Sequence, residues 1–117
     1  MSVIYARLNA STRTDRHESM ALIRETFAEH SGWILDVHLF SNISVNFNFE
    51  IELSHLFDVV GALEERGVKF NRRSHAFLDE QKGQLEGQDI PNSMGTLQVT
   101  FIHNDPDLRQ VIPAVPG

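Results

Sequence analysis

The sequence predicts a small α+β domain with the element order strand–helix–strand–strand–helix–strand and one further strand near the C-terminus. Strict apolar–polar alternation over Ile43–Leu53 (ISVNFNFEIEL) is typical of a strand that buries one face. Two other segments carry apolar residues at helical spacing. Gly32 and Gly67 follow these segments, at the position where helices commonly end. Together these patterns indicate strands and helices that share one core.

The chain begins with an alternating segment, Val3–Ala10, which predicts the first strand. Asp15 and Glu18 are spaced as in a capping box, so a helix is expected to begin after Asp15. Its buried face is expected to hold Met20, Ile23 and Phe27.

Trp33–Phe40 is the predicted second strand, and it forms a hairpin with Ile43–Leu53. A two-residue loop would set polar residues opposite apolar ones. A three-residue loop, Phe40–Asn42, sets four apolar pairs on one face and is therefore expected. The expected pairs are Leu39–Ile43, Val37–Val45, Leu35–Phe47 and Trp33–Phe49.

Ser54 is the expected cap of a second helix, and Val68–Asn71 is expected to form the fourth strand. Right-handed crossovers place both helices on one face of an antiparallel sheet, which is the ferredoxin-like arrangement.

The remainder of the chain is more polar. Asp79–Gly95 is expected to be a polar loop, and Thr96–His103 a last strand that pairs with the fourth. Residues 104–117 are expected to form an irregular tail, and residues 1–117 a single domain.

Composition excludes several classes of function. A net charge of −6 disfavours binding to nucleic acid or to an anionic membrane surface. The chain has no cysteine, so it has neither a disulfide framework nor a thiolate site. The sequence shows no secretory signal and no apolar run of membrane-spanning length, so a cytoplasmic location is expected.

If the odd residues of Ile43–Leu53 face the helices, its even residues lie on the open face of the sheet. Neighbouring strands add Tyr5, Gln98 and Thr100 to this face. Asparagine is disfavoured in strands, so two at alternate positions suggest a special role. A polar ligand site, a subunit interface and a solvated surface are all compatible with this pattern. The predicted ligand-binding residues are Arg7, Asp36, His38, Asn46, Asn48 and Glu50.

Other chemistry has less support. Six histidines occur without a metal-binding spacing, so neither a metal nor another cofactor is expected. No phosphate loop, nucleophile elbow or triad pattern is present, and no catalytic residue is assigned. The alternative is a cofactor-free enzyme that uses His38 with Asp36 or Glu50 as acid and base. A weaker anion-binding prediction rests on Lys69, Arg72 and Arg73.

The element order resembles that of ligand-sensing domains of the ACT type and of small dimeric monooxygenases. The resemblance is one of topology, because LNASTRTDR lacks the glycine-rich turn that ACT domains use after the first strand. The lack of catalytic motifs and the amide-rich sheet face, rather than this resemblance, predict a binding or regulatory module, a homodimer whose open face takes a small polar ligand or a protein partner.

Overall fold

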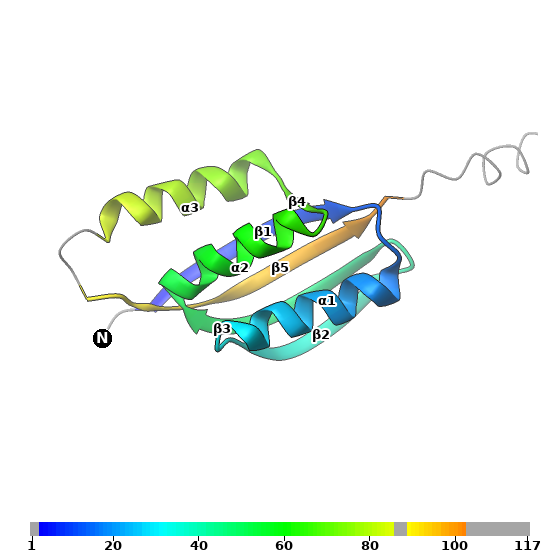
Figure 1. The fold of residues 1–117 in the computed structure, drawn as a ribbon, viewed down its shortest axis with the longest axis horizontal. Helices are drawn as coiled ribbons and strands as arrows, with labels where there is room; N and C mark the ends of the chain where they lie inside the picture. Colours follow the sequence, from blue (N-terminus) through cyan, green and yellow to red (C-terminus); the bar gives the residue numbers. More distant parts are fainter. Residues whose placement is uncertain (1–2, 86–88, 103–117) are drawn as a thin grey trace, which may run out of the picture.

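The structure is a computed structural model that describes residues 3–85 and 89–102. These residues form an α+β fold with one mixed five-stranded sheet and three helices (Figure 1). The strands are β1 (Val3–Thr12), β2 (Trp33–Ser41), β3 (Ser44–Glu52), β4 (Val68–Phe70) and β5 (Asn92–Phe101). The helices are α1 (Arg16–Glu29), α2 (Leu53–Glu65) and α3 (Arg72–Gln84). The strand order is β2-β3-β5-β1-β4.

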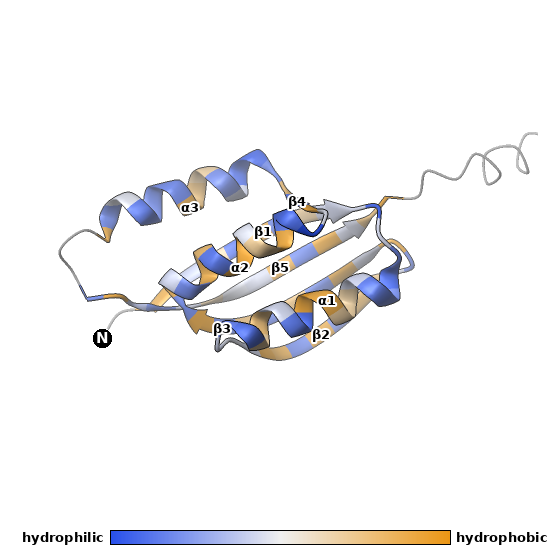
Figure 2. Cartoon of the chain, viewed as in Figure 1, coloured by the Kyte–Doolittle hydropathy of each residue, from blue (hydrophilic) through white to orange (hydrophobic). Residues whose placement is uncertain are grey.

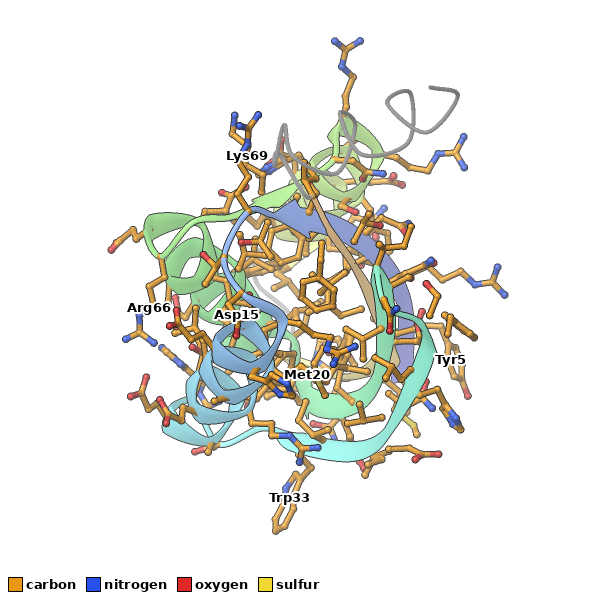
Figure 3. The ribbon with its side chains drawn as sticks, turned by 90° about the vertical axis from the view of Figure 1, so that its right-hand side faces the viewer. Tyr5, Asp15, Met20, Trp33, Arg66 and Lys69 are labelled. Atoms are coloured by element: carbon orange, nitrogen blue, oxygen red, sulfur yellow. The ribbon has the colours of Figure 1, made fainter. Side chains whose placement is uncertain are left out.

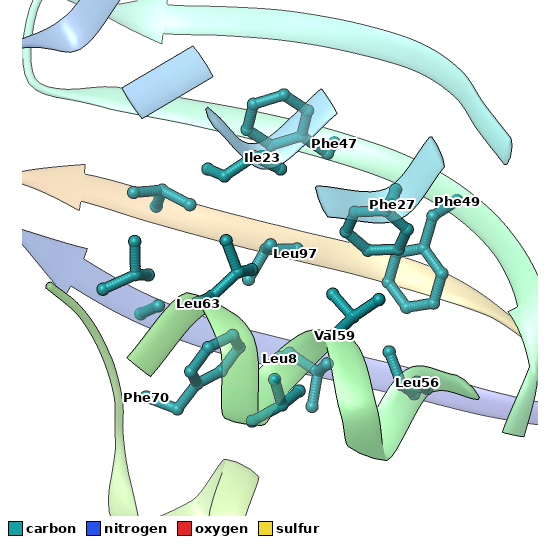
Figure 4. Close-up of a cluster of buried hydrophobic side chains, with 14 of the residues drawn as sticks. Leu8, Ile23, Phe27, Phe47, Phe49, Leu56, Val59, Leu63, Phe70 and Leu97 are labelled. Atoms are coloured by element: carbon teal, nitrogen blue, oxygen red, sulfur yellow. The ribbon is translucent and has the colours of Figure 1, made fainter. Parts of the chain in front are cut away.

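Helices α1 and α2 lie side by side over one face of the sheet, and the core lies between them and the strands (Figures 1 and 4). Alternation along β3 buries Phe47 and Phe49, and α1 contributes Ile23 and Phe27 to the same layer. The rings of Phe27 and Phe49 stand 5.2 Å apart between centroids. The other face of the sheet bears none of the described helices.

The position of β5 differs from the expectation. It does not form a hairpin with β4; it lies between β3 and β1, antiparallel to β3 and parallel to β1 over ten residue pairs. The sheet is therefore mixed rather than antiparallel, and its order differs from the ferredoxin-like one. The physical reason is α3, which carries the chain back along the sheet so that β5 begins beside the start of β1 (Figure 1).

Helix α3 also corrects the expected loop at Asp79–Gly95. That segment contains the second half of α3 and the first residues of β5. Asn71 caps α3 by accepting a hydrogen bond from the Ser74 amide at 2.9 Å. Figure 2 shows α3 as mostly hydrophilic, which explains why apolar periodicity gave no signal for it. The expected tail, 104–117, lies outside the described residues.

The register of the hairpin was also predicted wrongly. The connection between β2 and β3 is Asn42-Ile43, and Leu39 pairs with Val45. Two irregularities in β2, between Ile34 and Asp36 and between Leu39 and Ser41, shift the pairing. Apolar residues still meet across the strands because the observed register between the irregularities is displaced by two residues, which keeps the same face inward: Val37 pairs with Phe47 and Leu39 with Val45.

The helix ends follow the sequence closely. The Asp15 carboxylate accepts hydrogen bonds from the amides of His17 and Glu18, as the capping pattern predicts. Gly67 has a φ of 98°, in the left-handed region that suits glycine. At the end of α1, however, Ser31 and not Gly32 adopts the left-handed conformation, with a φ of 62°. Helix α2 begins one residue before Ser54, with Glu52 at its cap position.

Candidate ligand-binding face

The open sheet face is the side of the sheet opposite α1 and α2. Strand register arranges its side chains in rows that each cross β2, β3, β5 and β1 in that order. The four rows are Trp33–Glu50–Met94–Tyr5, Asp36–Asn48–Thr96–Arg7, His38–Asn46–Gln98–Asn9 and Ser41–Ser44–Thr100–Ser11. The first row therefore has aromatic side chains at both ends with Glu50 and Met94 between them, and the second has charges at both ends. The third row has His38 followed by three amides, and the fourth has hydroxyls.

All six residues predicted for ligand binding lie on this face. Asp36 and Arg7 occupy opposite ends of one row, three strand spacings or about 14 Å apart across the sheet. Glu50 lies in the neighbouring row, beside Trp33. The expected cross-strand partners of Asp36 and His38 were Asn46 and Ser44; the observed partners are Asn48 and Asn46.

The centre of the face is a network of neutral amides. The Asn46 amide group donates to the Asn48 carbonyl oxygen at 3.2 Å, and the Gln98 amide group donates to the Ser44 hydroxyl at 3.2 Å. These side chains are half-buried. Each primary amide has two donor hydrogens and two acceptor lone pairs, so these bonds leave further hydrogen-bonding capacity directed outward.

His38 and Asp36 form the most polar contact of the face. The Nε2 atom of His38 lies 2.8 Å from the carboxylate of Asp36, which also accepts from the amide of Val37 at 2.9 Å. More than half of each side chain is exposed, 57% for His38 and 55% for Asp36. Among residues 3–85 and 89–102, no group of three histidine or acidic side chains is placed to hold a metal ion.

Two aromatic residues mark the ends of the first row. Tyr5 is 75% exposed on β1, and Trp33 is 70% exposed on β2 (Figure 3). The sequence pattern predicts Trp33 in the core because Trp33 is in phase with Val37; the irregularity after Ile34 instead sets Trp33 opposite Glu50. No sequence signal marks that irregularity. Trp33 also lines two hollows, of about 550 Å³ and about 320 Å³, which both include Ser31.

The residues predicted for anion binding lie on β4, at the margin of the sheet, and at the start of α3. Lys69 pairs with Ser11, so it continues the row of hydroxyls at the edge of the open face. Lys69 is exposed and lines a hollow of about 480 Å³ together with Arg13 and Glu64. Arg72 and Arg73 occupy the exposed first turn of α3. Because Glu64 places a carboxylate in the hollow that Lys69 lines, the positive charge there is partly offset.

Neither a protein-family model nor a curated protein nor a solved structure matches this chain significantly. In the described part of the chain, no helix is both long enough and apolar enough to cross a membrane.

Proposed function

We propose that this protein is a binding module whose open sheet face holds a small neutral ligand rich in hydroxyl or amide groups. The single observation behind this proposal is the amide network at the centre of the sheet, where Asn46, Asn48 and Gln98 adjoin the row of hydroxyls. Such groups pair well with a ligand that both donates and accepts hydrogen bonds. The flanking aromatics, Tyr5 and Trp33, provide apolar surfaces beside them.

A regulatory role through a bound ligand or a protein partner belongs to the same proposal, as does a homodimer in which the open face stays accessible. The alternative, a cofactor-free enzyme, would use His38 with Asp36 or Glu50. An acid–base pair works best where solvent is excluded and its pKa values are shifted. The exposure of both His38 and Asp36 favours binding over acid–base catalysis.

The experiment is a titration of the isotope-labelled full chain, followed by two-dimensional amide NMR. The probes are a neutral trisaccharide and a neutral capped tripeptide, each added to about 10 mM, where a millimolar complex is well populated. We expect one of the probes to shift the resonances of Asn46, Asn48 and Gln98. Shifts for neither probe, or shifts confined to the helical side, would contradict the proposal.

A matched variant pair makes the test specific. Asn46→Leu combined with Asn48→Leu removes the central amides and is expected to weaken binding at least tenfold. Gln84→Leu changes an exposed amide at the end of α3, outside the open face, and is expected to leave binding unchanged. Equal binding by both variants would show that the amides do not hold the ligand.

A further inference from the structure

The outer edge of β2 lacks a partner strand. β2 stands at one end of the strand order, so its outer side pairs with none of the described strands. The amide of Val37 donates to the carboxylate of Asp36 in its own strand and not to β3, so a partner strand would replace this side-chain bond. Main-chain groups on an exposed edge are a template for another strand.

The edge lacks two of the usual protective side chains. Trp33–Ser41 contains neither lysine nor proline, and its two irregularities lie on either side of the regular segment 36–39, where the pairing would be centred. Large apolar side chains are exposed along it and at the adjoining hairpin, at Trp33, Leu35, Leu39, Phe40 and Ile43. Exposed apolar residues concentrated on one element indicate a contact surface.

The sequence of β2 is complementary to itself. We propose that two copies of the chain pair through β2, antiparallel, around a two-fold axis at Val37. This register sets Leu35 opposite Leu39 of the partner subunit and Asp36 opposite His38 of the partner subunit. A centre at Asp36 would instead oppose two carboxylates, and a centre at His38 two imidazoles. Only the Val37 centre sets each acid opposite a histidine while matching leucine with leucine, so the Asp36–His38 contact of 2.8 Å within each chain would join that of the other copy across the axis.

Neighbouring features fit the same arrangement. The axis at Val37 brings Trp33 to the hairpin end of the other copy, near Ile43 of the partner subunit. Trp33 borders an apolar hollow of about 550 Å³ that also includes Gly32 and Ile34. A partly exposed tryptophan beside a hollow is a common anchor of protein interfaces.

The far edge of the sheet explains why association would stop at two copies. There β4 has only three residues, and α3 satisfies the outward backbone groups of Asn9 in β1. Joining two β2 edges makes one continuous sheet from two five-stranded ones and leaves only the covered edges outside. The open faces then lie on the same side of the joined sheet. The inference rests on the homodimer of the proposed function, but the ligand titration does not depend on it.

The test is sedimentation equilibrium on the full chain from about 1 µM to about 1 mM, a range that spans common dimer affinities. A monomer–dimer equilibrium is expected, with slower hydrogen exchange of the Val37 amide as the concentration rises. Leu39→Lys places a charge in the interface and is expected to abolish the dimer. Tyr5→Lys is the control, because it alters the open face and not the edge.

A charge swap tests the register. His38→Asp sets two carboxylates opposite each other across the axis and is expected to weaken association at least tenfold. Adding Asp36→His restores an acid–histidine pair and is expected to recover association. A chain that stays monomeric throughout would overturn the inference. So would a dimer that Tyr5→Lys disrupts and Leu39→Lys spares. Ligand binding by a monomer would leave the ligand-binding part of the proposed function standing and would remove its homodimer.

Discussion

The two edges of the sheet, formed by β4 and β2, differ in strand length and in the exposure of their side chains. At one edge β4 is short, its Phe70 is buried, and α3 follows directly. There the amide of Asn9 donates to the Ser74 hydroxyl at 2.9 Å, and the carbonyl of Asn9 accepts from the Asn71 amide at 2.9 Å. At the other edge β2 extends over nine residues, and its Phe40 is 65% exposed.

The difference is that large side chains are buried at the β4 edge and exposed to solvent at the β2 edge. At the covered edge the N-terminus of α3 satisfies the backbone groups of Asn9, the residue that precedes the three residue pairs between β1 and β4. The β2 edge keeps its apolar side chains in solvent, so it gains stability only when another chain covers them. Substitutions at the covered edge should therefore change folding, whereas those at the β2 edge should change association.

The largest contrast is expected between two phenylalanines. Phe70→Ala removes a buried ring at the covered edge and is expected to lower the free energy of unfolding by about 3–5 kcal/mol. Phe40→Ala removes an exposed ring and is expected to change it by less than about 0.5 kcal/mol in the monomer. Urea denaturation at low protein concentration measures both values. Similar losses for the two variants would show that the β2 edge is part of the folded core.

The second prediction concerns β5, the central strand of the sheet, which lies between the two edges. A Cβ atom at Gly95 would overlap the backbone carbonyl of Ala6 on β1. Gly95→Ala is therefore expected to cost about 3 kcal/mol, because two paired backbones must move apart. The control is Gly61→Ala on α2, where a Cβ meets nothing within 4 Å and helix propensity should add about 0.5–1 kcal/mol. Thermal unfolding compares them. A Gly95→Ala variant as stable as the unmodified protein would show that β1 and β5 can move apart at this position without loss of stability.

The third prediction tests the junction between α3 and β1. Ser74→Ala leaves the Asn9 amide without its partner in a half-buried site and is expected to cost about 2 kcal/mol. The same change at Ser41, on the exposed edge, should cost less than about 0.5 kcal/mol, since water can replace the hydroxyl. Chemical denaturation, combined with hydrogen exchange at Asn9, measures the effect. An unchanged Asn9 exchange rate would show that α3 does not protect β1.

The smallest expected effect is at the helix cap of the covered edge. Asn71→Ala removes the side-chain acceptor for the Ser74 amide and is expected to cost about 1 kcal/mol. Asn71→Asp keeps an acceptor and should recover most of that loss. Circular dichroism during urea titration distinguishes the variants. Equal stability for both would mean that the cap contributes little to holding α3 on the sheet.

Much of the candidate site could be predicted because alternation in a strand is a local property. The pattern of Ile43–Leu53 placed Asn46, Asn48 and Glu50 on one face whatever their neighbours were. Trp33 was misplaced because the irregularity in β2 leaves no mark in the local sequence. Helix α3 was not predicted because the contact that holds it is not local either. Its Ser74 hydroxyl binds the amide of Asn9, which is 65 residues earlier in the chain.

The sequence by itself determined the α+β class, five strands in sequence order, the start of α1 at Asp15, the glycine that ends α2, and the polar character of the open face. These depend on side-chain period, caps and glycine conformation, which act within a few residues. Only the tertiary structure decided that β5 lies between β3 and β1, that α3 covers one edge, and that Trp33 faces solvent at the other. Those outcomes depend on packing between segments far apart in the chain. An example is Gly95 on β5, which lies so close to the backbone of Ala6 on β1 that a Cβ atom would overlap it.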